Sequence, residues 1–262
     1  MNFPRRKSDR KPRSTLVTSL VWQAVPAKAE EARAIREAAV GRGVWENPLQ
    51  YPADFTPGIR GSTPWPVVDE FPRVAAAAAL LEGHWEAIRD EFTENELISV
   101  AQDQFEAIST QSQSEPAARW AVLPAFHEGE ACGCGGRGCA TVCRLLPRLQ
   151  RHVSVTGIMF SIVGSGAHLR PHCGPNNRRL KLHLVSCHDI AAIWVAFFSR
   201  CQRDRCGQGL IVPQPTRMRI GTETRSWAEG KCNFLDDSFD HEVSNESGEN
   251  RVVLEVIFDR PK

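Results

Sequence analysis

Residues 170–178 read RPHCGPNNR, and residues 236–243 read DDSFDHEV. Each stretch places one histidine, His172 or His241, where a turn meets a short apolar segment. Neutral imidazole is a common ligand of iron, and two imidazoles leave several coordination positions open for other ligands. The two stretches therefore favour a metal ion held between separate strands of a small β-barrel.

Short β-prone segments surround these two stretches, and Gly, Pro, Asn or Asp residues separate them. The segments are residues 155–163, 180–184, 218–220, 232–235 and 252–258. Short strands with frequent turns are typical of a sandwich, jelly roll or barrel. Arg251 begins the last of these apolar runs, where its guanidinium could hold a carboxylate with a two-pronged hydrogen bond.

The N-terminal half is predicted to be helical and strapped by prolines. Residues 30–40 are helix formers that end at a Gly-Arg-Gly sequence, and the prolines and aromatic residues of 44–72 favour an extended strap lying on a folded body. Residues 140–150 predict one or two helical turns that end at Pro147. A spacing of four, three and four residues predicts one amphipathic helix whose apolar face holds Leu81, Trp85, Ile88 and Phe92.

The composition argues against several classes of partner. A chain of 262 residues with 42% apolar residues, 24% charged residues and a net charge of +1 is ordinary for a globular protein, and it gives no reason to expect nucleic acid. No run reaches the ~18 apolar residues of a membrane span, so no transmembrane segment is expected.

Residues 1–29 are predicted to be a basic, disordered tail of a soluble, cytoplasmic protein. A secretory or organellar targeting segment is the alternative.

Four of the nine cysteines cluster among glycines, at Cys132, Cys134, Cys139 and Cys143. Four thiolates could bind zinc, but structural zinc sites usually bring their ligands in two separated pairs. The sequence therefore favours a glycine-rich loop whose thiols are free or partly oxidised.

Several longer motifs follow one another along the chain. They are PHCGPNN at 171–177, LKLHL at 180–184, ETRSWAEGK at 223–231 and DDSFDHEV at 236–243, with weaker ones, GVWENPLQ and PGIR, at 43–50 and 57–60. Together these motifs resemble the aspartyl/asparaginyl β-hydroxylase family. The resemblance implies an α+β protein with a mainly-β core, a double-stranded β-helix (a jelly-roll, cupin-like barrel) flanked by N-terminal helices. Residues 30–262 would form a single domain, with flanking part 30–150 and barrel 151–262.

The resemblance also implies a reaction and its metal site. Members of the family are Fe(II)- and 2-oxoglutarate-dependent dioxygenases, which would use O₂ to hydroxylate a β-carbon of Asp or Asn residues in a protein or peptide substrate. His172 and His241 would bind the iron. Most relatives in the wider oxygenase class have a carboxylate two residues after the first histidine, where this chain has Gly174. Water would fill that coordination position, and Asp237 would orient it.

Four further residues would bind 2-oxoglutarate. Arg251, with Ser161 alongside, would hold the far carboxylate, and His183 would lie near the other one. Lys181 stands where many relatives have arginine, so it keeps the positive charge but loses the two-pronged geometry.

Two other functions remain open. One is a jelly roll that binds a metal or a dicarboxylate without turnover. The other is a related oxygenase that acts on a lipid or a small molecule, because fold-level analogy is weak for substrate. The combination of Arg251, Ser161 and His183 favours an enzyme, since a purely structural barrel needs no clamp for a cosubstrate.

Residues 185–208 interrupt the motifs. Without them, residues 182–184 would run directly into residues 209–213 as one family-like strand. Val185 and Ser186 can be encoded by GTGAGT, a splice-donor sequence, and Gln208 by CAG, which ends a splice acceptor. We hypothesise that this insertion is a translated intron. A genuine surface insertion is the alternative, because loops tolerate insertions.

Overall fold

The computed structural model describes residues 29–59, 62–95, 97, 120–130, 132–133, 139–187 and 215–261. The basic tail predicted for residues 1–29 therefore lies outside the described residues, apart from Ala29. Within the described ranges, no helix combines the length and the apolar character that crossing a membrane requires.

Two antiparallel sheets form the core of the fold. One has five strands in the order β1-β2-β9-β4-β7, and the other has four strands in the order β3-β8-β5-β6. Most neighbouring strands, such as β2 and β9 or β3 and β8, are far apart in sequence, as in a jelly roll, so the predicted cupin-like barrel is confirmed. The strands are β1 (Trp120–His127), β2 (Val155–Val163), β3 (His168–His172), β4 (Arg179–Cys187), β5 (Thr216–Ile220), β6 (Glu223–Arg225), β7 (Cys232–Leu235), β8 (His241–Asn245) and β9 (Arg251–Asp259).

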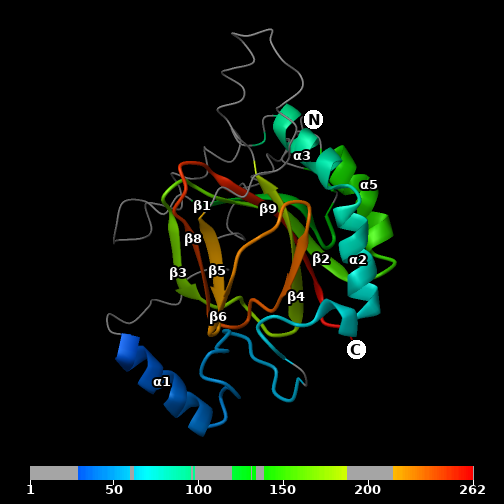
Figure 1. The fold of residues 1–262 in the computed structure, drawn as a ribbon. Helices are drawn as coiled ribbons and strands as arrows, with labels where there is room; N and C mark the ends of the chain where they lie inside the picture. Colours follow the sequence, from blue (N-terminus) through cyan, green and yellow to red (C-terminus); the bar gives the residue numbers. More distant parts are fainter. Residues whose placement is uncertain are drawn as a thin grey trace, which may run out of the picture.

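Helices cover one face of the five-stranded sheet. Figure 1 shows α2 (Pro72–Glu82), α3 (Trp85–Glu94) and α5 (Ala140–Leu149) on one side of the barrel, while α1 (Ala29–Gly41) lies apart from them. Successive side chains of a strand point to opposite faces of a sheet. The alternate residues Leu180, Leu182 and Leu184 of β4 are fully buried beneath these helices. The intervening residues of β4 face the space between the two sheets, where the candidate site lies.

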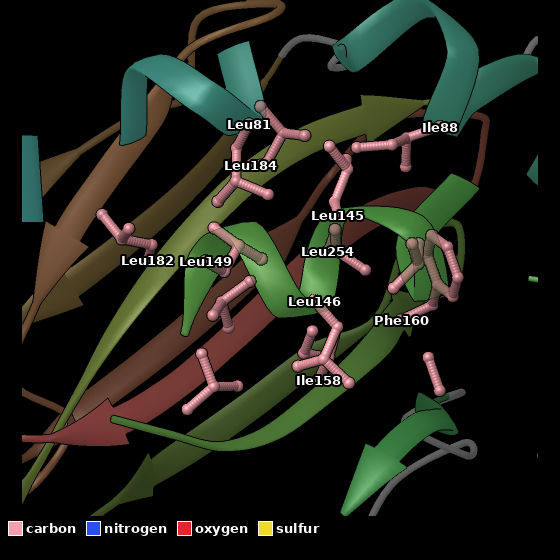
Figure 2. Packing of buried hydrophobic residues seen from close by; sticks show 14 of the residues in the cluster. Leu81, Ile88, Leu145, Leu146, Leu149, Ile158, Phe160, Leu182, Leu184 and Leu254 are labelled. Carbon is pink, nitrogen blue, oxygen red and sulfur yellow. The ribbon is translucent and has the colours of Figure 1, made fainter. Parts of the chain in front are cut away.

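Figure 2 shows leucine, isoleucine and phenylalanine side chains filling the layer between the helices and the five-stranded sheet. Phe160 of β2 is 1% exposed, and its ring centroid lies 4.8 Å from that of Phe92 in α3. A second apolar cluster, which includes Val243, Val253 and Trp227, fills part of the space between the sheets.

Truncating Phe160 to alanine should destabilise the fold strongly. The substitution removes buried surface and leaves a cavity, so we expect the free energy of unfolding to fall by about 3–5 kcal/mol. Urea denaturation monitored by circular dichroism measures this change. Val67→Ala is the matched control, because Val67 is 56% exposed and its loss should change the free energy little. A fall of similar size in both variants would contradict this packing.

The predicted strap lies on the barrel. Residues between α1 and α2 form isolated β-bridges, Gln50 with Phe239 and Asp54 with Asn176. The Gln50 side-chain amide donates a 2.8 Å hydrogen bond to the Ser238 hydroxyl, and the Tyr51 hydroxyl donates one to Asp240. The strap therefore braces both stretches that carry the candidate metal-binding histidines.

Two helix predictions need correction. The amphipathic helix expected through Leu81 and Phe92 is broken into α2 and α3 at Gly83 and His84. The His84 ring nitrogen Nδ1 lies 2.8 Å from the Leu80 carbonyl oxygen, the acceptor that the backbone N–H of residue 84 would use in a continuous helix.

Pro147 does not end the other helix, because α5 continues through Leu149. Proline removes one backbone donor near the end of this helix. The burial of Leu145, Leu146 and Leu149 against the sheet keeps the last turn in place.

The structure also constrains the cysteine loop. Cys132 and Cys143 form a disulfide, and Cys139 is disulfide-bonded as well. Cys134 lies outside the described residues. Sulfur atoms that are held in disulfides cannot act as zinc-binding thiolates, so the partly oxidised loop is the form that the structure shows.

The first three residues of the predicted insertion continue strand β4. Residues 185, 186 and 187 belong to β4, where they pair with Val253, Val252 and Arg251 of β9. This pairing is possible because Val185 continues the alternation of the strand and its buried side chain joins the apolar cluster between the sheets. The remainder, residues 188–208, lies outside the described residues.

Candidate active site

The pairing of β3 with β8 brings the two predicted metal-binding histidines together. His172 and His241 are direct partners in the antiparallel register, and a bulge between Leu169 and His172 precedes the pair. Their ring centroids are 4.2 Å apart. Residues 69 positions apart in the chain thus present neighbouring imidazoles.

Backbone carbonyls fix the tautomer of both rings. His172 Nδ1 lies 2.6 Å from the Arg170 carbonyl oxygen, and His241 Nδ1 lies 2.9 Å from the Phe239 carbonyl oxygen. A carbonyl oxygen only accepts hydrogen bonds, so Nδ1 carries the proton in each ring and Nε2 keeps its lone pair. This arrangement is the usual one for a histidine that binds a metal through Nε2.

Burial keeps the two imidazoles neutral. Burial lowers the pKa of His172, and burial together with the neighbouring His172 lowers the pKa of His241 to about 3. Neutral imidazole is the form that binds metal ions. Among the described residues, no group of three or more His, Cys, Asp or Glu side chains is arranged to hold a metal ion. The two neutral imidazoles are the residues of this site that could serve as metal ligands.

The carboxylate of Asp237 occupies the space above Gly174. A Cβ atom built on Gly174 would lie only 2.5 Å from Asp237 Oδ2 and 2.7 Å from Oδ1. The backbone N–H of Gly174 donates a 2.6 Å hydrogen bond to the Asp237 carbonyl oxygen, which fixes the two segments together. Gly174, two residues after His172, has no side chain. Asp237 therefore supplies the carboxylate beside this position.

The remaining four predicted residues share the inner face of the five-stranded sheet. In the register, Ser161 lies opposite Val253, and Arg251 lies two residues from Val253 on β9. Residues two apart on a strand point to the same face, as do direct partners on neighbouring strands. The same rule places Lys181 and His183 of β4 on this face, because His183 lies opposite residue 255 of β9. All four predictions therefore converge on one surface.

Arg251 and Ser161 are held by tryptophans. Arg251 is 1% exposed, and its guanidinium carbon lies 4.3 Å from the centroid of the Trp227 ring. The indole N–H of Trp120 donates a 3.1 Å hydrogen bond to Ser161 Oγ. Stacking on an aromatic face fixes the plane of a guanidinium, and the hydrogen bonds of its fork are made in that plane.

Lys181 bridges two carboxylates of the site, those of Asp237 and Glu255. Its Nζ atom lies 3.0 Å from Asp237 Oδ2 and 2.9 Å from Glu255 Oε2. Burial would lower the pKa of Lys181, but the two carboxylates outweigh this effect and raise the pKa above its usual value. Lys181 is therefore protonated and anchors the carboxylate of Asp237 above Gly174.

Glu255, a buried acid in the middle of β9, was not among the residues predicted from the sequence. Its Oε1 atom lies 3.7 Å from His183 Nε2, while its other oxygen accepts the hydrogen bond from Lys181. The signal was present in the sequence, because Glu255 is the one charged residue in the apolar run 252–258. A charged residue at such a position is rarely buried unless it is paired.

His183 should make the metal-free protein sensitive to acid. Burial lowers its pKa from 6.5 to about 4, so below pH 6.5 the unfolded chain takes up a proton that the folded chain does not. The free energy of unfolding should therefore fall as the pH decreases from 6.5 to 4. For one such group the slope approaches about 1.4 kcal/mol per pH unit. Urea titrations at several pH values should give a shallower slope for His183→Asn, and equal slopes would contradict this assignment.

Comparisons with known proteins show which family the chain resembles. A family model described as Aspartyl/Asparaginyl beta-hydroxylase matches residues 82–261. The chain is 27% identical over 179 residues to the aspartyl/asparaginyl beta-hydroxylase of Mus musculus, which covers 67% of this chain and 20% of that protein. It is 34% identical over 116 residues to the ornithine lipid ester-linked acyl 2-hydroxylase of Rhizobium tropici, which covers 43% of this chain and 33% of that protein.

The chain thus spans a fifth to a third of the length of these relatives. Among solved structures, a cupin domain of an XRE family transcriptional regulator from Enterobacter cloacae is similar, with a TM-score of 0.30 and 12% identity. That similarity covers 55% of this chain and 98% of the cupin chain.

Proposed function

Because the chain belongs to the aspartyl/asparaginyl β-hydroxylase family, we propose that it is an Fe(II)- and 2-oxoglutarate-dependent oxygenase that hydroxylates a β-carbon. The observation that carries this proposal is the histidine pair, whose Nδ1 atoms are both engaged by backbone carbonyls while their Nε2 atoms keep their lone pairs. The substrate class that we propose is an Asp or Asn side chain in a protein or peptide.

The residues of the site divide into a metal-binding group and a cosubstrate-binding group. His172 and His241 would hold Fe(II) through Nε2, and Asp237 would orient a water molecule beside Gly174. When bound, Fe(II) supplies the chemistry that couples oxidative decarboxylation of 2-oxoglutarate, to succinate and CO₂, with hydroxylation of a C–H bond by O₂.

The chain's own contribution is to bind and orient the cosubstrate. Arg251 presents its guanidinium from a position that is almost fully buried, so it would pair with the far carboxylate without competition from bulk water. Ser161 Oγ accepts a hydrogen bond from Trp120, which directs the hydroxyl hydrogen of Ser161 away from Trp120 and toward a bound oxygen. His183, neutral and buried, would border the carboxylate that lies next to the keto group.

The proposal can be tested by measuring Fe(II)-dependent conversion of 2-oxoglutarate to succinate. The chain is assayed with peptides that contain Asp or Asn and, separately, with an ornithine lipid, since a relative named for acyl-chain hydroxylation is 34% identical over part of the chain. We expect succinate formation with a peptide that gains one oxygen atom by mass spectrometry. Gain of oxygen by the lipid alone would overturn the substrate class.

A chain that binds Mn(II) and 2-oxoglutarate but produces no succinate with either substrate would favour a binding protein without turnover. The chain without residues 185–208 is assayed in parallel, so that the effect of the insertion is measured separately. Sequencing of transcripts decides between the two origins of the insertion, because its retention in all mature transcripts would contradict the intron hypothesis.

A further inference from the structure

The carboxylate of Glu255 lies between the two residues expected to border one end of 2-oxoglutarate. Its Oε2 atom accepts a 2.9 Å hydrogen bond from Lys181 Nζ, and its Oε1 atom lies 3.7 Å from His183 Nε2. Neither ring nitrogen of His183 has a hydrogen-bond partner among the described residues. An internal carboxylate thus lies where a carboxylate of the cosubstrate would meet Lys181 and His183.

The charges of the four side chains around this position cancel before a metal ion is bound. Lys181 and Arg251 are positive, while Asp237 and Glu255 supply two negative charges that are both buried. Burial alone would raise the pKa of Glu255, but Lys181 outweighs burial and holds that pKa below its usual range, so Glu255 is ionised at neutral pH. Without Glu255, the same cluster would carry one net positive charge.

We propose that Glu255 is an internal competitor of the cosubstrate, and that its carboxylate occupies the subsite formed by Lys181 and His183. This inference rests on the proposed function, because it concerns how that same site receives a 2-oxo acid. Glu255 lowers the affinity for 2-oxoglutarate, whose near carboxylate must displace the Glu255 carboxylate from Lys181. Like charges at this distance repel, and Lys181 would otherwise face three carboxylates, those of Asp237, Glu255 and the cosubstrate.

Two consequences separate this role from that of a simple counter-ion for Lys181. If Glu255 only oriented Lys181, its neutralisation would loosen the lysine and weaken binding of the cosubstrate. If Glu255 competes, its neutralisation tightens binding. The gain is larger for ligands that carry the carboxylate next to the keto group, because Glu255 contacts Lys181 directly and lies four residues along β9 from Arg251.

The experiment measures ligand binding to the Mn(II)-loaded chain by isothermal titration calorimetry. The wild-type chain and Glu255→Gln are titrated with 2-oxoglutarate and with 4-oxopentanoate, which keeps the keto group and the far carboxylate but lacks the near one. We expect Glu255→Gln to bind 2-oxoglutarate at least about tenfold more tightly, a change of about 1.4 kcal/mol. The affinity for 4-oxopentanoate should change less than the affinity for 2-oxoglutarate.

The matched control is Glu223→Gln, which removes one negative charge from an exposed pair with Arg225. Its affinity for both ligands should equal that of the wild-type chain. Thermal unfolding checks that each variant is folded, and Glu255→Met, a side chain of similar length without charge, provides a second variant with the same expected direction.

Equal or weaker binding of 2-oxoglutarate by the folded Glu255 variants would overturn the inference and leave the proposed function intact. An equal gain for both ligands would also overturn it, because it would indicate a general field and not an occupied subsite. If no chain bound 2-oxoglutarate although Mn(II) bound, the proposed function itself would fail. Binding of 2-oxoglutarate by the Glu255 variants but not by the wild-type chain would support the inference most strongly.

Discussion

Replacing His241 by alanine should abolish both metal binding and succinate formation. His241 is buried, and its Nε2 atom would be one of the two imidazole ligands that the pair with His172 offers a metal. Loss of a residue that merely supports a metal ligand weakens metal affinity by about 10–100-fold. Loss of one of two ligands should therefore weaken Mn(II) binding by more than about a hundredfold, measured by calorimetry alongside the succinate assay.

The control for this substitution lies on the same sheet. His168 begins β3 and is exposed, and its Nε2 atom lies 2.8 Å from Glu242 Oε2 on the outside of the barrel. His168→Ala should keep full metal binding and turnover, because it removes an imidazole that is remote from the pair. His172→Ala should behave as His241→Ala does. Normal Mn(II) affinity in folded His241→Ala protein would show that the histidine pair is not the metal site.

The jelly roll could be predicted from the sequence because its signals are local. The predicted strands at 155–163 and 232–235 coincide with β2 and β7, and the predicted runs at 180–184, 218–220 and 252–258 lie within β4, β5 and β9. The break at Gly83 and His84 could not be predicted from apolar spacing, since Leu81, Ile88 and Phe92 keep a helical period across it. The contact between the His84 side chain and the Leu80 carbonyl oxygen does not change the spacing of the apolar residues.

The candidate site could also be predicted only where the signals are local in the sequence. The order of the motifs along the chain was enough to indicate His172, His241, Arg251 and Asp237. The partners of Lys181 depend on which strands pair, and strand register over long sequence separations is not encoded by any one segment. The three-dimensional arrangement alone therefore reveals that Lys181 joins Asp237 to Glu255. A lysine in this place, which the sequence suggested would bind less firmly than arginine, has two carboxylates to hold it.

Substituting alanine for Gly174 should have the second-largest effect on activity. The backbone of Gly174 does not have a positive φ, so alanine is not excluded by backbone conformation. Its Cβ would instead lie 2.5 Å from Asp237 Oδ2, and Lys181 holds that oxygen in place at 3.0 Å. Either the carboxylate moves or the strands separate, and overpacking of this kind lowers the free energy of unfolding by about 1–3 kcal/mol.

Displacement of Asp237 should lower succinate formation by about 10–100-fold, the range found when a group that supports a metal site is lost. Gly248→Ala is the matched control, because a Cβ at Gly248 meets no atom within 4 Å. A double-mutant cycle identifies the cause: in an Asp237→Gly background, Gly174→Ala has nothing to displace, so the second substitution should cause little further loss. If the two substitutions instead lower succinate formation by independent factors that multiply, Gly174→Ala does not act through Asp237. Full activity of Gly174→Ala would show that the position of the Asp237 carboxylate does not matter for turnover.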